Sequence, residues 1–362
     1  MSPKYTNSNS RQRHPRPKQR RHKQRRRAAR RRLFFFAAFL VAVLALGTHV
    51  FRSSNHDQPA PPDTSDDPVV SVVDPAPVVD IPEPEFNWTA TGDTREVDAS
   101  FPSEFVILTD LDSGEIIARK NADTKINPAS MTKILTLLVA VENIPDTSGT
   151  YTMNFDITDY CFINECSVVG YEVDEVIPVS ELFYGCILNS GADACLALAD
   201  VAAGSHENFV VLMNQKLEEL GLSDTAHFTH CVGLYDEDHY CTVGDMAIIL
   251  KAALENDKAR EVLSTRVFTL STTNKHPEPQ DMSNWFIRRI EDQDTGAVDV
   301  LYAKTGYVSQ SGFCAASGGV TPDGKTYLCV TGNSYSTKQS IADHAQLYRT
   351  YIEEETSSDS ST

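Results

Sequence analysis

The stretch that decides the fold runs Asn127-Pro128-Ala129-Ser130-Met131-Thr132-Lys133-Ile134. The segment 128–143 begins within this stretch. Its apolar side chains recur at helical spacing, and most of the positions between them are apolar as well. This pattern predicts a buried helix, with Asn127 placed to cap it and Pro128 suited to its first turn. Ser130 and Lys133 then lie three residues apart on one helix face, so the amine can reach the hydroxyl.

Two further segments carry polar residues in a recognisable pattern. They run Leu188-Asn189-Ser190-Gly191-Ala192-Asp193-Ala194 and Ala303-Lys304-Thr305-Gly306-Tyr307. Together with the first stretch they resemble the motifs of the penicillin-recognising serine peptidases: S-x-x-K, a central serine motif and K-T-G. Smaller matches indicate a resemblance to the low-molecular-weight D-alanyl-D-alanine carboxypeptidases (peptidase S11). These matches are Met213-Asn214, Leu220-Gly221, Thr225, Gly233-Leu234, His239-Tyr240, Thr242 and Asp245. The resemblance covers roughly Ser103 to Gly332.

The resemblance implies a catalytic role for three side chains. Ser130 forms the acyl-enzyme, Lys133 accepts its proton, and Ser190 passes a proton to the departing D-alanine. A serine hydroxyl is a weak nucleophile at neutral pH and needs a nearby base. A lysine serves as that base only where burial or a second cation keeps it partly neutral. Ser130 also lies near the positive end of its own helix, which favours negative charge developing on its oxygen.

The K-T-G segment is implied to bind the substrate. Lys304 and Thr305 would hold its terminal carboxylate, and Lys304 would be the second cation near the base. Gly306 would leave room for the substrate to lie against this strand. The backbone N–H groups of Ser130 and Tyr307 would form the oxyanion hole.

One position departs from the family pattern. The central motif is usually Ser-x-Asn, and its amide contacts the substrate and the catalytic lysine, but this chain has Ala192 at that position. A water or another side chain replaces the amide, or the rate is reduced, or the protein binds more than it hydrolyses. The sequence leaves these alternatives open.

The segment before the helix predicts the edge of a sheet. Residues 105–108 and 115–118 are apolar and are separated by Asp112-Ser113-Gly114, which is typical of two strands joined by a tight turn. The resemblance implies an α/β fold of the β-lactamase and transpeptidase-like type. In that fold an antiparallel sheet is flanked by helices, and the site lies between it and a mostly helical part. We expect this peptidase domain over residues 96–352.

The N-terminus predicts a membrane anchor. Residues 1–32 contain 14 Lys or Arg and no acidic residue, and residues 33–51 are apolar apart from Thr48 and His49. At ~1.5 Å per residue this segment would cover roughly 28 Å as a helix, about one hydrocarbon core. We expect a disordered cytoplasmic arm (1–32), which could also contact nucleic acid or anionic lipid, and a single-pass anchor in the cell membrane (33–51), with the rest outside. The alternative is a signal peptide cleaved near Gly47, which would give a secreted protein.

The remaining segments have low complexity. Eight of the 18 prolines lie between Pro59 and Pro84, so residues 52–95 are predicted to be a Pro/Asp-rich linker near polyproline II. Residues 353–362 read as an acidic, disordered tail. From Leu33 onward, 32 − 14 = 18 basic residues face 50 acidic ones, a net charge of −32. Such a surface repels a phosphate backbone, which excludes nucleic acid as a partner of the folded domain.

The eight cysteines allow several interpretations. Outside the cell disulfides can persist, and Cys161–Cys166 and Cys231–Cys241 are then the best candidate pairs; free buried thiols are the alternative. Metal-ligand spacing and a phosphate-binding loop are both missing, so we predict no metal and no cofactor. His239 is interpreted as structural.

The reaction implied by the resemblance is removal of the terminal D-alanine from peptidoglycan stem peptides that end in D-Ala-D-Ala. β-Lactams would be acylating inhibitors. A β-lactamase shares these motifs, but no Glu-x-x-x-Asn follows the central motif to hold a hydrolytic water as in class A enzymes. A β-lactam-binding or wall-binding module with weakened catalysis is a second alternative, because Ala192 replaces the motif asparagine.

Overall fold

The computed structural model describes residues 86–352. The predicted arm (1–32), membrane span (33–51) and tail (353–362) lie outside the described residues, as does most of the predicted linker. Among residues 86–352 no single helix is long and apolar enough to cross a membrane. Two neighbouring helices, 192–203 and 206–219, reach that length and hydropathy only together, and they are bent by 83° relative to each other.

The centre of the fold is a six-stranded sheet with strand order β1-β3-β2-β10-β9-β8. Its strands are β1 (Thr89–Glu96), β2 (Phe105–Asp110), β3 (Glu115–Lys120), β8 (Asp299–Val308), β9 (Gly312–Val320) and β10 (Thr326–Ser334). All neighbours are antiparallel except β1, which runs parallel to β3. Two small two-stranded sheets pair β4 (Thr150–Thr152) with β5 (Val176–Pro178), and β6 (Val267–Leu270) with β7 (Gln280–Ser283).

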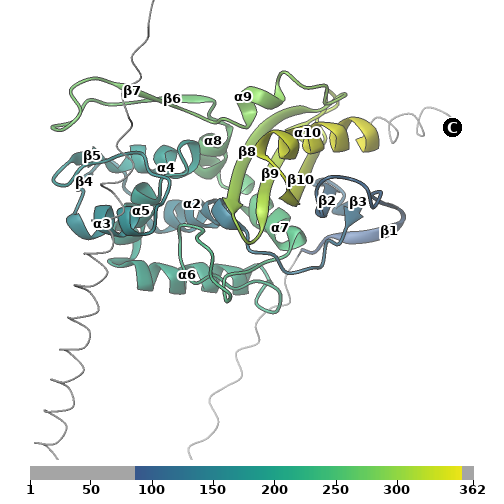
Figure 1. Cartoon of the computed structure of the whole chain (residues 1–362), viewed down its shortest axis with the longest axis horizontal. Coiled ribbons are helices and arrows are strands. Elements are labelled where there is room, and N and C mark those ends of the chain that lie inside the picture. The colour runs from purple at the N-terminus through teal and green to yellow at the C-terminus, as the bar shows by residue number, and fades with distance from the viewer. Residues whose placement is uncertain (1–85, 353–362) are drawn as a thin grey trace, which may run out of the picture. The chain divides into compact units, whose positions relative to one another are not determined.

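Helices lie on both faces of the sheet and build a second, mostly helical part (Figure 1). They are α2 (Thr132–Asn143), α3 (Phe155–Ile163), α4 (Val179–Leu188), α5 (Ala192–Ala203), α6 (His206–Glu219), α7 (Val243–Glu255), α8 (Asp257–Ser264), α9 (Ile287–Ile290) and α10 (Thr337–Leu347), with short turns η1 (Ala129–Met131) and η2 (Tyr348–Ile352). The predicted fold class is therefore confirmed, with a sheet that is mixed at its β1 edge.

Strand alternation explains why both faces of the sheet are covered. On β10, Leu328 and Val330 join the large apolar core that includes α2 and α7, whereas Tyr327 and Cys329 join a smaller core under α9 and α10. Successive side chains of a strand point to opposite faces, so a strand that is apolar at nearly every position needs helices on both sides.

The predicted boundary between linker and domain at residues 95 and 96 is corrected by β1. Thr89 and Ala90 pair with Glu115 and Ile116 of β3, and Trp88 is buried in the larger core. The segment was read as linker because β1 is mostly exposed and polar, so no apolar period marks it. The folded part thus begins at or before residue 86.

Candidate active site

The turn that carries Ser130 leads directly into the buried helix α2. The residues predicted to be one helix form a 3₁₀ turn, η1, followed by α2. Lys133 is 2% exposed, and its Nζ donates to Ser130 Oγ at 3.0 Å and to the Val232 carbonyl at 2.5 Å. The three-residue spacing therefore brings hydroxyl and amine into contact. Burial also removes the lysine from bulk water, as a lysine base requires.

Two glycines let other segments pack closely against this turn. A Cβ at Gly306 of β8 would lie 2.8 Å from the Ser130 nitrogen, and one at Gly233 would lie 2.1 Å from the Ala129 carbonyl oxygen. Ala129 itself has φ +47°, which is strained for a residue with a side chain. A Cβ at Gly306 would also lie 2.8 Å from Cys314 Sγ, so glycine at this position is needed for packing as well as for the predicted substrate space. The Ser130 and Tyr307 N–H groups consequently lie on adjoining segments.

Asn127 holds the start of the turn in place. Its side chain accepts from the Ala129 N–H at 3.0 Å and donates to the His239 carbonyl at 3.0 Å. The His239 ring contacts Thr132 Oγ1 at 2.8 Å and accepts from the Thr229 N–H at 3.1 Å. Burial is the main reason why the pKa of His239 lies well below its usual value, so the ring is neutral. These contacts agree with the structural interpretation of His239.

A second serine–lysine pair lies beside the first. Lys304 Nζ donates to Ser190 Oγ at 2.9 Å and to the Thr305 carbonyl at 2.9 Å. The side chain is buried, and desolvation together with repulsion from the Lys133 ammonium lowers the pKa of Lys304 to about 7. Near neutral pH this amine thus exchanges readily between its charged and neutral forms.

Ser190 sits in a sharp turn between α4 and α5. Its φ is +54°, which is uncommon for a residue other than glycine. The Gly191 N–H donates to the Gly185 carbonyl at 3.0 Å, and the Ala192 N–H donates to the Ser167 carbonyl at 2.8 Å. Strain of this kind is typical of functional turns that their surroundings hold in place.

Asp193 anchors this turn to a neighbouring loop. Its buried carboxylate accepts the backbone N–H groups of Val169 (2.9 Å), Gly170 (2.9 Å) and Tyr171 (3.3 Å), besides that of Ala194 (2.9 Å). Desolvation raises the pKa of Asp193, and the same N–H groups oppose that rise. The sequence gives no signal for this role, because Val169, Gly170 and Tyr171 lie more than twenty residues before Asp193 in the chain.

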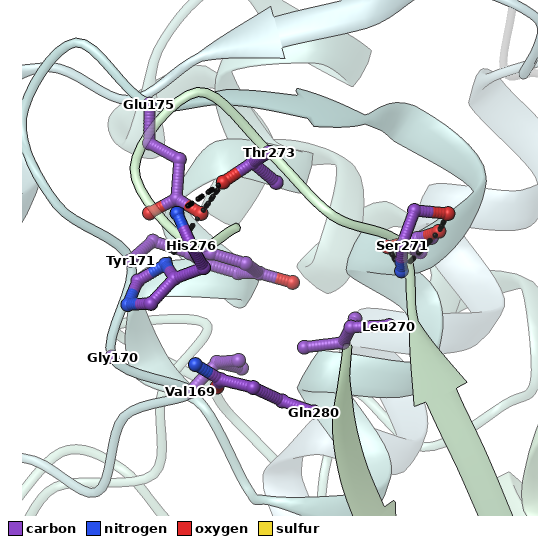
Figure 2. A pocket seen from close by; sticks show the side chains of 10 residues that line it. Val169, Gly170, Tyr171, Glu175, Leu270, Ser271, Thr273, His276 and Gln280 are labelled. Atoms are coloured by element: carbon purple, nitrogen blue, oxygen red, sulfur yellow. Dashed lines mark hydrogen bonds and ion pairs between the residues drawn. The ribbon is translucent and has the colours of Figure 1, made fainter. Parts of the chain in front are cut away.

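The same loop borders a small polar pocket (Figure 2). In it His276 Nδ1 lies 2.9 Å from Glu175 Oε1, Thr273 Oγ1 donates to that oxygen at 2.7 Å, and Glu181 accepts from the Ser271 N–H at 3.1 Å. The Tyr171 hydroxyl points into the pocket and has no hydrogen-bond partner among the described residues. The predicted site residues do not line this pocket, which has room for about one water molecule.

Ala192, which replaces the motif asparagine, is 1% exposed. A partly exposed thiol, Cys166, lies next to its backbone partner Ser167. The pKa of Cys166 is lowered, chiefly by a hydrogen bond with Cys161 and also by the Lys133 ammonium.

The structure brings Ser130 to Lys133 and Ser190 to Lys304, and it places Thr305, Gly306 and Tyr307 in sequence along β8. Their catalytic and binding roles stay predictions. All eight cysteines are free thiols in this structure, which therefore contains neither of the predicted disulfides, Cys161–Cys166 and Cys231–Cys241. Short sequence spacing suggested both pairs, and the Cys161 and Cys166 side chains do meet, as hydrogen-bonded thiols.

The chain is similar in sequence to known D-alanyl-D-alanine carboxypeptidases. A model of the D-alanyl-D-alanine carboxypeptidase family, peptidase S11, matches residues 92–333. The D-alanyl-D-alanine carboxypeptidase DacF of Bacillus subtilis is 29% identical over 225 residues, which cover 61% of this chain and 54% of that protein. The D-alanyl-D-alanine carboxypeptidase of Streptomyces sp. strain K15 is 30% identical over 225 residues, covering 60% and 75%.

A solved structure shares the fold of this chain. The crystal structure of the Streptomyces K15 DD-transpeptidase superimposes with a TM-score of 0.63 and 24% identity, covering 70% of this chain and 98% of that one. The chain spans about half the length of the Bacillus relative. The family match, which covers most of the described residues, and the two serine–lysine pairs together show that this chain belongs to the peptidase S11 family, the D-alanyl-D-alanine carboxypeptidases.

Proposed function

We propose that the chain is a serine-type D-Ala-D-Ala carboxypeptidase that removes the terminal D-alanine of peptidoglycan pentapeptides through an acyl-serine intermediate. The observation that carries this proposal is the 3.0 Å contact between Lys133 Nζ and Ser130 Oγ, with a second buried amine, Lys304, beside it. An activated serine needs such a base within hydrogen-bond reach. Family membership supports the choice of substrate.

In acylation, Ser130 Oγ attacks the carbonyl carbon between the two D-alanines, and Lys133 takes the hydroxyl proton. The C–N bond then breaks, and the departing amine receives a proton through Ser190. Burial and repulsion from Lys133 lower the pKa of Lys304 to about 7, so the doubly charged pair is disfavoured near neutral pH. Water then hydrolyses the ester and restores Ser130.

The substrate would be held by the K-T-G segment. A charged Lys304 and the Thr305 hydroxyl would bind the terminal carboxylate, and the N–H groups of Ser130 and Tyr307 would stabilise the oxyanion. The close packing of Gly306 on the Ser130 nitrogen supports this arrangement, since it brings β8 against the serine turn. Penicillins would acylate Ser130 in the same way.

The cellular setting is part of the proposal. Residues 33–51 would anchor the protein in the cell membrane, with the basic arm in the cytoplasm and the catalytic domain outside, where its substrate lies. Cleavage near Gly47 would instead release the domain. The 32-residue length of the basic arm favours the anchor over a signal peptide, and its arginines favour an N-terminus in the cytoplasm.

The test is D-alanine release from diacetyl-Lys-D-Ala-D-Ala by the full chain in detergent. We expect the wild type to release D-alanine, Ser130→Ala to release none, and Ser223→Ala, which changes an exposed serine, to match the wild type. Release by Ser130→Ala at the wild-type rate would contradict the assigned nucleophile.

A second function, a β-lactam-binding or wall-binding module with weakened catalysis, is favoured by one observation. Ala192 is buried and has no side-chain polar group where the family motif carries an amide. The variant Ala192→Asn distinguishes the two functions. If the wild type is silent, labelled penicillin still marks Ser130, and Ala192→Asn restores release, the binding module is the better description.

A further inference from the structure

Two cysteines face each other directly behind the catalytic turn. Cys186 in α4 and Cys195 in α5 have their sulfur atoms 3.2 Å apart, and neither residue is exposed to solvent. Ser190 lies between them in the sequence. The Cys186 thiol also lies 3.8 Å from the Lys133 carbonyl, so the pair touches the helix that carries the base.

The backbone around the pair explains this close approach. A Cβ at Gly185 would lie 3.1 Å from the Ala194 Cβ, so the missing side chain lets α4 and α5 pack tightly. The turn between them is closed by the Gly191 N–H, which donates to the Gly185 carbonyl at 3.0 Å. The Cys195 N–H then donates to the Gly191 carbonyl at 3.1 Å. The two thiols are therefore opposed because the turn that presents Ser190 is tight.

We propose that Cys186 and Cys195 are a disulfide-forming pair that joins α4 to α5 on either side of Ser190. A disulfide has an S–S distance of about 2.05 Å, so the sulfurs need to approach by only about 1 Å. The cross-link would fix the spacing of the two helices that present the Ser190 hydroxyl to Lys304.

The reaction needs an oxidant, which we identify by class as an oxidised thiol–disulfide oxidoreductase. One thiolate attacks a sulfur of the oxidant's disulfide and forms a mixed disulfide. The second thiolate then attacks the protein sulfur of that mixed disulfide. The two cysteines lose two protons and two electrons, and the oxidant leaves as a dithiol.

Burial determines when this exchange takes place. Desolvation, and then the contact with Cys186, raises the pKa of Cys195 well above its usual value, so thiolate is scarce in the folded chain. The pair is also inaccessible to a second protein. Oxidation therefore precedes the final packing of α4 against α5. The predicted location outside the cell supplies the oxidising setting.

The first test maps disulfides in the full chain without any substitution. Cells are quenched with acid, free thiols are alkylated under denaturing conditions, and the purified chain is digested with a protease that cleaves before aspartate. Cys186 then lies in peptide 174–192 and Cys195 in peptide 193–199, whereas Cys161 and Cys166 share peptide 159–173. We expect peptide 174–192 to be linked to 193–199 before reduction. Alkylation of both cysteines, or a link to any other cysteine, would overturn the proposal.

The second test counts free thiols in denatured, unreduced Cys186→Ala. If the pair is a disulfide, the substitution releases Cys195 and the count rises by one relative to wild type. If both are thiols, the count falls by one, which would overturn the proposal. Cys329→Ala, which removes another buried cysteine, is the matched control and should lower the count by one. Neither test depends on the proposed enzymatic activity.

Discussion

Replacing Lys304 by methionine should stabilise the folded chain at pH 6 and impair its function. Burial and the neighbouring Lys133 ammonium lower the pKa of Lys304 from its usual 10.5 to about 7. In the unfolded chain the amine keeps its usual pKa, so the folded state binds fewer protons. The charged amine therefore lowers the free energy of unfolding. This loss of stability is fully present below pH 7, shrinks between pH 7 and 10.5, and is absent above pH 10.5.

The magnitude follows from the shift. At 1.36 kcal/mol per pKa unit, the lowered pKa of Lys304 corresponds to a loss of stability of at most about 5 kcal/mol at pH 6. Methionine fills similar space but loses the hydrogen bonds to Ser190 Oγ and the Thr305 carbonyl, which costs about 1–2 kcal/mol. We therefore expect Lys304→Met to raise the free energy of unfolding by roughly 3 kcal/mol at pH 6. At pH 10 the gain should fall to near zero or below.

The assay is urea unfolding at pH 6 and pH 10, followed by near-ultraviolet circular dichroism. Lys325→Met, which changes an exposed lysine in the β9–β10 turn, is the control and should leave stability unchanged at both pH values. A Lys304→Met variant that is less stable than wild type at pH 6 would contradict a destabilising charge on Lys304. A stability difference that is the same at both pH values would refute it equally.

Three further substitutions test other parts of the site and fold. Gly306→Ala places a Cβ 2.8 Å from the Ser130 nitrogen and should slow acylation by labelled penicillin at least tenfold, whereas Gly149→Ala, with open space around it, should not. Asp193→Asn should lower the free energy of unfolding by roughly 2–4 kcal/mol in urea titrations, because one carboxylate accepts four N–H groups; the exposed Asp224→Asn should have no effect. Burial lowers the pKa of His344 to about 3, so wild-type stability should fall by roughly 1.4 kcal/mol per pH unit below pH 6.5 through this residue, and His344→Gln should show a shallower fall.

The sequence predicted those helices, strands and turns that have a regular apolar pattern or typical turn residues. The helix after Asn127, the strands at 105–108 and 115–118, and the turn at Asp112 to Gly114 are all found, because apolar period and turn residues report burial directly. The Ser130–Lys133 contact follows from helical spacing. Strand β1 was missed because an exposed edge strand with polar residues has no such period.

Contacts between segments that lie far apart in the sequence could not be predicted from the sequence alone. The Cβ clash at Gly233 with Ala129, the bond from Lys133 to the Val232 carbonyl, and the loop held by Asp193 join segments that are far apart in sequence. The facing of Cys186 and Cys195 likewise depends on helix packing, whereas sequence spacing favoured two other pairs. These features need the fold, since only the packing of α4, α5 and β8 brings the groups together.

Ser130 is tested most directly as the nucleophile by the mass of the full chain after incubation with benzylpenicillin. Trypsin releases peptide 126–133, which contains Ser130 as its only serine. We predict one covalent penicillin per chain, on Ser130 in this peptide, and no adduct in Ser130→Ala. An unmodified wild-type chain, or an adduct on a different residue, would contradict the assignment of Ser130 as the nucleophile.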